Sequence, residues 1–176
     1  NDDNKFPIQK WGALAVHLLK TLVDKKFNIS KECRTETRIT SHYLEYKNHI
    51  SNKTLDIKYQ KKIGFPINDS VVRRSFVATG GTVLASKLSL DSKLACNTAV
   101  GSYHATFDFG AAYCDFNDVA DAANYLKNKG YARKILILDL DVHQGNGNSE
   151  IFENDKDVLT FSMHCASNYP AKKSKS

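Results

Sequence analysis

The segment that most constrains the fold is a run of four apolar residues, 135–138, followed at once by a dense polar motif. The run Ile-Leu-Ile-Leu is typical of a strand that is buried on both faces of a parallel sheet. Residues 158–162, Val-Leu-Thr-Phe-Ser, form a second such run. We therefore expect residues 135–139 and 158–162 to be neighbouring central parallel strands of an α/β domain, joined by a crossover connection.

The remaining segments are predicted from the spacing of apolar, small and turn-forming residues. Helices are expected in four places: residues 11–22, 35–48, 71–90 and 118–130. Asp118 would cap the last of these helices, and Gly130 would end it. Residues 63–66, Ile-Gly-Phe-Pro, are expected to interrupt regular secondary structure. A short strand is expected at 96–100 and an ordered functional loop at 101–117.

Composition limits the class of protein. The chain has 176 residues, of which 41% are hydrophobic and 25% charged, which favours a single globular domain over residues 1–176. The formal net charge is +6, but Lys172, Lys173 and Lys175 form a solvated basic run at the end of the sequence. No nucleic-acid-binding motif is present, so no nucleic-acid partner is expected.

The location of the protein is inferred from what its sequence lacks. No apolar stretch approaches the ~20 residues that a membrane-spanning helix needs, and the first residues hold no apolar signal core. The four cysteines, Cys33, Cys96, Cys114 and Cys165, contain no CxxC pair. We interpret them as reduced thiols of a cytoplasmic protein without a membrane partner.

The polar motif after residue 138 carries the sharpest chemical signal. Asp139, Asp141 and His143 alternate along the chain, so they would share one face of an extended segment. Ligands of α/β sheets lie beyond the carboxyl ends of the strands, and a carboxylate with an imidazole is a sound ligand pair for Zn²⁺. A single Asp there would more simply cap the sheet, but the whole Asp-x-Asp-x-His motif with its following glycines favours a metal site.

A second candidate residue is His104, in the glycine-rich loop 101–117. A lone histidine is often an ordinary core or surface residue. If His104 faces the metal site, it could take a proton from water there and pass one to a leaving group.

Taken together, these motifs resemble the histone deacetylase superfamily, and most closely its bacterial and class IV-like branch. The resemblance covers nearly the whole chain and rests on the following segments and residues: 5–11, His42, Tyr46, 63–66, 73–75, 79–82, 113–118, 139–147, 161–164 and 168–170. It implies the arginase/deacetylase fold, a three-layer α/β architecture with a central parallel sheet, here present in part.

The resemblance also implies two metal sites. Asp141 and His143 match two of the three protein ligands of the family's catalytic zinc. Asp139 matches a carboxylate that binds a structural monovalent cation such as K⁺, and Ser162 and the backbone of Met163 match further contacts to that cation.

Catalytic and substrate-binding roles follow from the same resemblance. His104 matches the second histidine of the family's His-His pair, its general acid/base, and Asn146 matches the residue that orients this ring. Tyr113 and Tyr169 match two aromatic residues that line the channel for an acyl-lysine stem, whose aliphatic part packs well between ring faces.

The sequence departs from the family pattern at three points. Tyr103 replaces the first histidine of the pair, and we expect its phenol to point toward Asp139. Val100 replaces a glycine. The family's third zinc ligand, an Asp, and its transition-state-stabilising Tyr have no counterpart before Ser176. The chain could be a fragment, a frameshifted gene product or a designed truncation, with an exposed sheet edge that a complementary C-terminal polypeptide or self-association would cover.

Two functions remain open. The first is a zinc-dependent deacetylase acting on acetyl-lysine or a small acetylated amine, weakly active or inactive as this chain alone. The second is a non-catalytic deacetylase remnant that serves as a binding or interaction module, which Tyr103 favours because a phenol cannot carry imidazolium charge near neutral pH.

Overall fold

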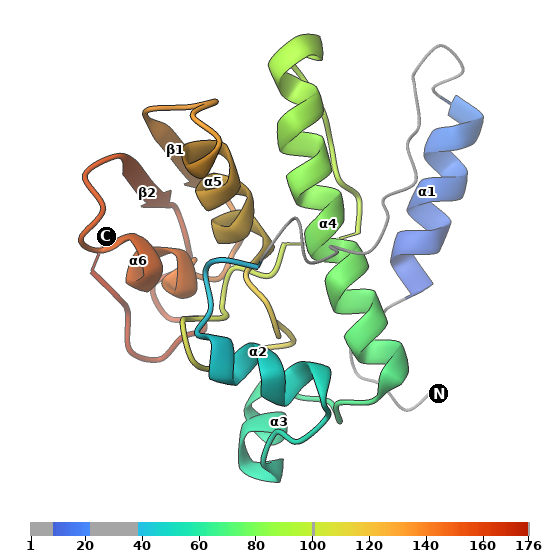
Figure 1. The fold of residues 1–176 in the computed structure, drawn as a ribbon, viewed down its shortest axis with the longest axis vertical. Coiled ribbons are helices and arrows are strands. Elements are labelled where there is room, and N and C mark those ends of the chain that lie inside the picture. Colours follow the sequence, from blue (N-terminus) through green and yellow to red (C-terminus); the bar gives the residue numbers. More distant parts are fainter. Residues whose placement is uncertain (1–8, 22–38, 100, 176) are drawn as a thin grey trace.

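The structure is a computed structural model that describes residues 9–21, 39–99 and 101–175 (Figure 1). Its elements follow in chain order: α1 (Gln9–Thr21), α2 (Leu44–Ser51), α3 (Ile57–Ile63), α4 (Asp69–Ser92), α5 (Asp118–Asn128), β1 (Ile135–Asp139), α6 (Asn146–Phe152) and β2 (Val158–Ser162). The expected residues 5–8, 35–38, Cys33 and Val100 lie outside the described residues.

The two strands are the expected ones, and they pair in parallel. The register runs from Ile135 opposite Val158 to Asp139 opposite Ser162. α6 lies within the connection between them, so the predicted parallel pair with a helical crossover is confirmed. The sheet formed by the described residues has these two strands, and their central position therefore stays a prediction.

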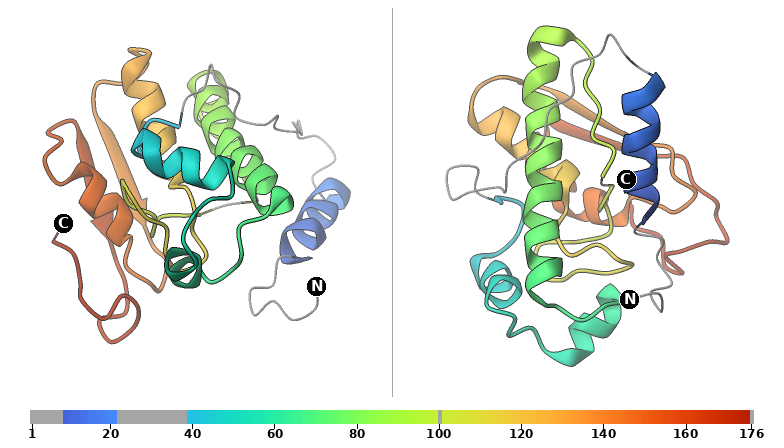
Figure 2. Two further views of the ribbon diagram at one scale, coloured as in Figure 1. Left: turned by 60° about the horizontal axis from the view of Figure 1, so that its bottom comes forward. Right: turned by 90° about the vertical axis from the view of Figure 1, so that its right-hand side faces the viewer.

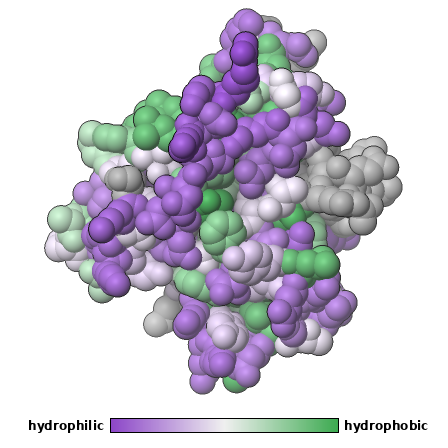
Figure 3. Space-filling view, turned by 60° about the vertical axis from the view of Figure 1, so that its left-hand side comes forward, coloured by the Kyte–Doolittle hydropathy of each residue, from purple (hydrophilic) through white to green (hydrophobic). Residues whose placement is uncertain are grey.

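One face of this sheet is packed and the other is open. The packed face meets α5 and α6 in one apolar cluster: Ala120, Ala123, Ile137, Ile151, Phe152 and Val158. On the opposite face, Leu136, Leu138, Leu159 and Phe161 are exposed, at 60%, 56%, 66% and 47%. The prediction that both faces are buried is therefore wrong for the described chain, because both flanking helices lie on the same side. Figure 3 shows apolar surface gathered in patches on an otherwise hydrophilic side of the molecule.

The long helix α4 forms a further layer against α5 (Figure 2). It contains the whole of the predicted helix 71–90, and α1 matches the predicted helix 11–22 closely. The predicted break at 63–66 is also confirmed, because α3 ends at Ile63 and Gly64 adopts the left-handed conformation with φ of 101°. None of the described helices is both long and apolar enough to cross a membrane.

One predicted element is wrong in part and another in full, and side-chain hydrogen bonds explain both. Of the predicted helix 35–48, residues 44–48 are helical in α2, but residues 39–43 are not, because the amides of Thr40 and Ser41 donate to Asp121 Oδ1 of α5, at 2.7 and 2.8 Å. Residues 96–99 form no strand. Asn97 instead ties this segment to α4 by donating from Nδ2 to Thr82 Oγ1 at 2.9 Å.

The ends of α5 differ from the prediction by one or two residues. Asn117, rather than Asp118, is the N-cap, and its side chain accepts a hydrogen bond from the amide of Ala120. The helix ends at Asn128, two residues before Gly130. As expected, the described cysteines, Cys96, Cys114 and Cys165, are free thiols.

His42 lies in a second core, which packs α2 and α3 against the loop before α5. The ring is 4% exposed and contacts the rings of Tyr46 and Phe116, with centroids 5.5 and 5.4 Å away. Its Nε2 accepts a hydrogen bond from the amide of Asn117 at 2.8 Å. Burial lowers the pKa of His42 to about 4. The ring is therefore neutral in the folded chain at neutral pH.

This buried histidine makes the chain sensitive to acid. The folded pKa of about 4 lies below the ordinary 6.5, so the contribution of neutral His42 is complete above pH 6.5 and is lost as the pH falls toward 4. The loss should reach ~3 kcal/mol of unfolding free energy. His42→Gln should be less stable at neutral pH but should lose less stability on acidification, as measured by urea denaturation across this range.

The matched control is His49→Gln, which changes a half-exposed histidine on α2. It should keep the acid dependence of the wild-type chain. Equal acid dependence in the wild type and in His42→Gln would contradict this assignment.

Candidate metal and catalytic site

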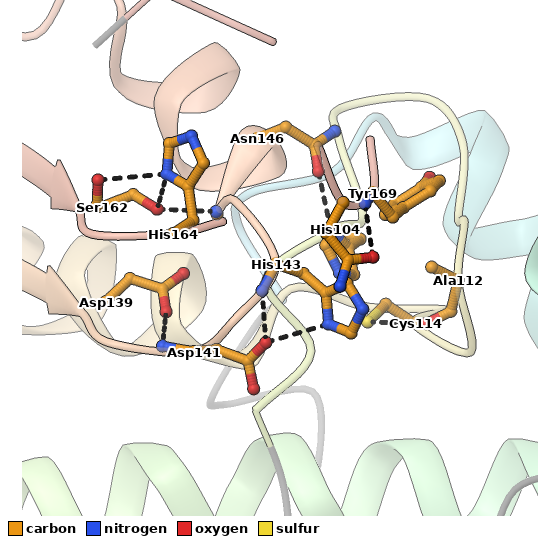
Figure 4. A network of polar contacts seen from close by, with 12 residues as sticks. His104, Ala112, Cys114, Asp139, Asp141, His143, Asn146, Ser162, His164 and Tyr169 are labelled. Carbon is orange, nitrogen blue, oxygen red and sulfur yellow. Dashed lines mark hydrogen bonds and ion pairs between the residues drawn. The ribbon is translucent and has the colours of Figure 1, made fainter. Parts of the chain in front are cut away.

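The candidate site lies beyond the carboxyl end of β1, where the chain turns toward α6 (Figure 4). A cavity of about 740 Å³ opens there. Its walls include the candidate residues Tyr103, His104, Tyr113, Asp141, His143 and Tyr169. Loop 101–117, the segment after β1 and the segment around Tyr169 thus meet at one cavity, and the functional role of the long loop stays a prediction.

Asp141 and His143 converge at this cavity. Asp141 Oδ1 lies 3.0 Å from His143 Nδ1 and also accepts the amide hydrogen of His143. Burial raises the pKa of Asp141, but the nearby phenol of Tyr103 and the hydrogen bonds from His143 outweigh it, so the net pKa is lowered and the group stays an anion. Two ligand atoms at ~2.1 Å from one tetrahedral zinc ion lie about 3.4 Å apart. The 3.0 Å between Asp141 Oδ1 and His143 Nδ1 is close to this spacing, so the pair could occupy two coordination positions of a single zinc ion.

A third protein ligand is not found in the described part of the chain. Among those residues, no three His, Cys, Asp or Glu side chains come together in a way that could hold a metal ion. The geometry therefore fits the predicted two ligands, and their role in metal binding stays a prediction.

Asp139 faces a different environment. Its Oδ1 accepts the amide hydrogen of Asp141 at 3.0 Å, and its Oδ2 is buried without a hydrogen-bond partner in the described chain. A Cβ atom at Gly145 would lie 2.3 Å from Oδ2, so glycine is needed for this approach. Because the chain turns after Asp139, the expectation that it shares one face with Asp141 and His143 is wrong.

The unpartnered oxygen of Asp139 fits the predicted monovalent cation. Ser162 lies opposite Asp139 across the sheet, and its Oγ accepts the amide hydrogen of Gly145 at 3.2 Å. The amide of Met163 donates to the Asp139 carbonyl at 2.9 Å. The candidate cation residues are thus neighbours behind the Asp141–His143 pair, while cation binding itself stays a prediction.

His104 is buried at the wall of the cavity and is held by Asn146. Its Nδ1 lies 2.6 Å from Asn146 Oδ1, so the predicted contact is present. An amide oxygen only accepts, so Nδ1 carries the hydrogen and Nε2 of the neutral ring is free to take a proton. Burial lowers the pKa of His104, which the bond to Asn146 partly offsets. The His143 ring lies 6.0 Å away between centroids.

Tyr103 lines the same cavity as Asp141. Burial raises the pKa of its phenol, and the nearby carboxylates of Asp141 and, more weakly, Asp139 raise it further. The phenol therefore lies close to a candidate metal ligand, and the expectation that it points toward Asp139 stays a prediction.

The two predicted channel tyrosines both line the cavity. The Tyr169 ring stands edge-on to His104 and His143, with centroids 4.9 and 6.3 Å away. Tyr113 stacks on Phe65 at 6.4 Å, and its own backbone has a positive φ of 66°. Their places suit a channel wall, and their contact with substrate stays a prediction.

Two further residues at the site were not assigned a role from the sequence. Gln144 holds the segment 169–174 in place. Its backbone amide donates to the Tyr169 carbonyl, and its side chain makes two hydrogen bonds with the backbone of Ser174, donating one and accepting the other. Its position next to His143 in the polar motif is the sequence feature that could have indicated a role for Gln144 at the site. Cys114 also lines the cavity, but burial raises its pKa to about 12, so it is no nucleophile.

Comparison with known proteins agrees with this site. The family model for the histone deacetylase domain matches residues 8–176. The chain is 45% identical over 135 residues to an uncharacterised protein of Picosynechococcus sp., covering 77% of this chain and 45% of that one. It is 31% identical over 131 residues to the acetoin utilization protein AcuC of Staphylococcus aureus, covering 69% and 33%.

Solved structures show the same fold. The HDA15 HD domain superposes with a TM-score of 0.74 at 23% identity, covering 93% of this chain and 50% of that one. An HDAC homolog complexed with SAHA superposes with a TM-score of 0.72 at 27% identity, covering 82% and 41%. The chain belongs to the histone deacetylase family, and it spans less than half the length of these curated relatives.

Gly147 offers a test of how tightly the site loop is seated. A Cβ atom there would lie 2.3 Å from the Ala105 carbonyl oxygen and 2.5 Å from that of Tyr103. Gly147→Ala should therefore lower the unfolding free energy by about 1–3 kcal/mol, although alanine favours a helix. Urea denaturation measures this, with Glu150→Ala as a control at an exposed position of α6. A Gly147→Ala chain as stable as the wild type would contradict the close contact.

Proposed function

We propose that this chain carries the site of a zinc-dependent deacetylase that acts on acetylated amines, either acetyl-lysine or a small acetylated amine. The observation that carries the proposal is the meeting of the Asp141–His143 pair with the free Nε2 of His104 at one cavity. Family membership supports the reaction class, because the chain matches the histone deacetylase domain.

Each group has a distinct task in this proposal. Asp141 and His143 would hold zinc, which acts as a Lewis acid on a carbonyl and makes water more acidic. His104 Nε2 takes the proton of the attacking water and passes it to the leaving amine, while Asn146 keeps the ring in the required tautomer. Tyr113 and Tyr169 pack on the aliphatic stem of the acetylated amine.

A cation and a further polypeptide belong to the same proposal. Asp139 and Ser162 would hold K⁺ behind the zinc ligands, which suits the buried Asp139 oxygen without a partner. The open apolar face of β1 and β2 favours burial against a complementary polypeptide or a second copy of the chain.

The second candidate function is a non-catalytic deacetylase module that binds a partner or an acyl group. The observation that favours it is the place of the Tyr103 phenol close to Asp141 in the cavity, because a phenol there cannot supply the positive charge of an imidazolium. The two functions differ in turnover, which the experiments below measure.

Zinc affinity tests the ligand pair. We expect the wild-type chain to bind zinc weakly by titration calorimetry, because catalytic zinc normally has three protein ligands. Asp141→Asn should weaken binding at least ~10-fold, since a neutral amide is a poor zinc ligand. Asp157→Asn, which alters an exposed carboxylate paired with Lys134 before β2, is the matched control. Equal affinity in the wild type and in Asp141→Asn would rule out this ligand.

Turnover tests the catalytic roles. In the zinc-loaded chain, His104→Gln should slow hydrolysis of an acetyl-lysine peptide by ~10² or more, because proton transfer is lost. Tyr103→His should speed it, because an imidazole can add positive charge near the reacting carbonyl. His49→Gln controls for a histidine change elsewhere. A wild type as fast as Tyr103→His would contradict the role given to Tyr103, and turnover absent from every variant would favour the non-catalytic module.

A further inference from the structure

Two adjacent side chains at the start of α5 face the loop that carries Tyr103 and His104. Asn117 donates from Nδ2 to the Ala105 carbonyl at 3.1 Å. Asp118 accepts the amide hydrogen of Ser102 on Oδ1 at 2.7 Å. The backbone of the two candidate catalytic residues is therefore bracketed, with one hydrogen bond on each side.

Asn117 is itself held in place by the core. It is fully buried, its amide donates to His42 Nε2 at 2.8 Å, and its Oδ1 accepts the amide hydrogen of Ala120 at 2.9 Å. The side chain thus uses its acceptor to cap α5 and its donor to hold the loop at Ala105. If Asn117 moved, Ala105, the residue next to His104, would move with it because the two are hydrogen-bonded.

Asp118 is held as firmly. It is 1% exposed, and its Oδ2 accepts a hydrogen bond from Thr82 Oγ1 of α4 at 2.5 Å. Ser102 is thereby tied to α4 through a single buried carboxylate. Both ends of the segment 102–105 are therefore fixed to helices that pack against each other.

The opposite side of the segment meets α6. Gly147 approaches the carbonyl groups of Tyr103 and Ala105 so closely that a Cβ atom would overlap them, and the preceding Asn146 holds the His104 ring. The ring can meet Asn146 only if its backbone is seated against Gly147. The hydrogen bond from Asn117 to the Ala105 carbonyl holds this backbone in place.

Helix capping does not explain the choice of asparagine. Ser and Asp cap helices about as well as Asn, because capping needs only an acceptor oxygen. Aspartate has no donor, and serine offers one short hydroxyl for both contacts, whereas the asparagine amide adds a separate donor, Nδ2, which here reaches the Ala105 carbonyl. We propose that Asn117 is a positioning residue for His104, with Asp118 as its counterpart at Ser102. This role rests on the proposed function, in which His104 moves the proton.

The hydrogen bond can be tested first in the wild-type chain. Nuclear magnetic resonance should detect scalar coupling across the bond from Asn117 Nδ2 to the Ala105 carbonyl carbon. The two ring nitrogens of His104 should show clearly separated ¹⁵N shifts, with Nδ1 protonated and Nε2 bare. A folded wild type without the cross-bond coupling would overturn the proposal without any variant.

Variants then separate positioning from capping. Asn117→Ser and Asn117→Asp keep a capping oxygen but remove Nδ2, which donates to Ala105. Serine has only a shorter hydroxyl in its place, and Asn117→Asp places a carboxylate oxygen against that carbonyl. In both, the His104 nitrogen shifts should move toward each other as the fixed tautomer is lost. The control is Asn68→Ser, which changes the exposed N-cap of α4, where the side chain only accepts from Val71. It should leave the His104 shifts unchanged.

Two outcomes would overturn the proposal: His104 shifts unchanged in both Asn117 variants, or shifts that move equally in Asn68→Ser. If the chain turns over an acetyl-lysine peptide, Asn117→Ser should lower kcat by about 10²-fold with little change in KM. If the wild type has no turnover but the His104 shifts respond to Asn117→Ser, the proposed function fails while the positioning role stands.

Discussion

The parallel pairing of β1 with β2 is the constraint on which the site depends. The register puts Asp139 opposite Ser162 at the carboxyl end of both strands. From that edge the chain turns through Asp141 and His143, using each carboxylate to hold an amide two residues ahead. The turn directs Asp139 inward, behind the sheet edge, and Asp141 with His143 outward to the cavity. One short polar motif thereby places two separate sets of candidate ligands, Asp139 on one side and Asp141 with His143 on the other.

The helices act as supports for this edge. α5 and α6 cover one face of the sheet, and residues at their starts hold the loop with the candidate residue His104. Asn146, the first residue of α6, contacts the His104 ring, and Asn117, the N-cap of α5, donates to Ala105. Burial of these polar contacts strengthens them but also makes them costly to break. The neutral, buried His42 accepts a hydrogen bond from the amide of Asn117 and so connects this support to the core. The same residues therefore contribute both to the stability of the fold and to the geometry of the site.

Local patterns in the sequence predicted the two strands, the helices α1, α4 and α5, and the approach of Asp141 to His143, because each depends on short-range spacing. The His104–Asn146 contact joins residues 42 apart in the sequence, and its prediction came from the family resemblance. Local patterns failed where distant side chains decide the structure: Asp121 holds residues 40 and 41 out of a helix, and Asn97 replaces strand pairing by a bond to α4. The turn of Asp139 toward Gly145 is likewise something that residue alternation alone could not show.

Zinc binding by the Asp141–His143 pair is the central question of the site, since the phenol of Tyr103 lies close to the same carboxylate. The most direct measurement is a crystal structure of the chain with added zinc, with anomalous diffraction recorded at the zinc edge. The account predicts a zinc peak bonded to Asp141 Oδ1 and His143 Nδ1. A zinc-saturated crystal with no peak between these two atoms would contradict it.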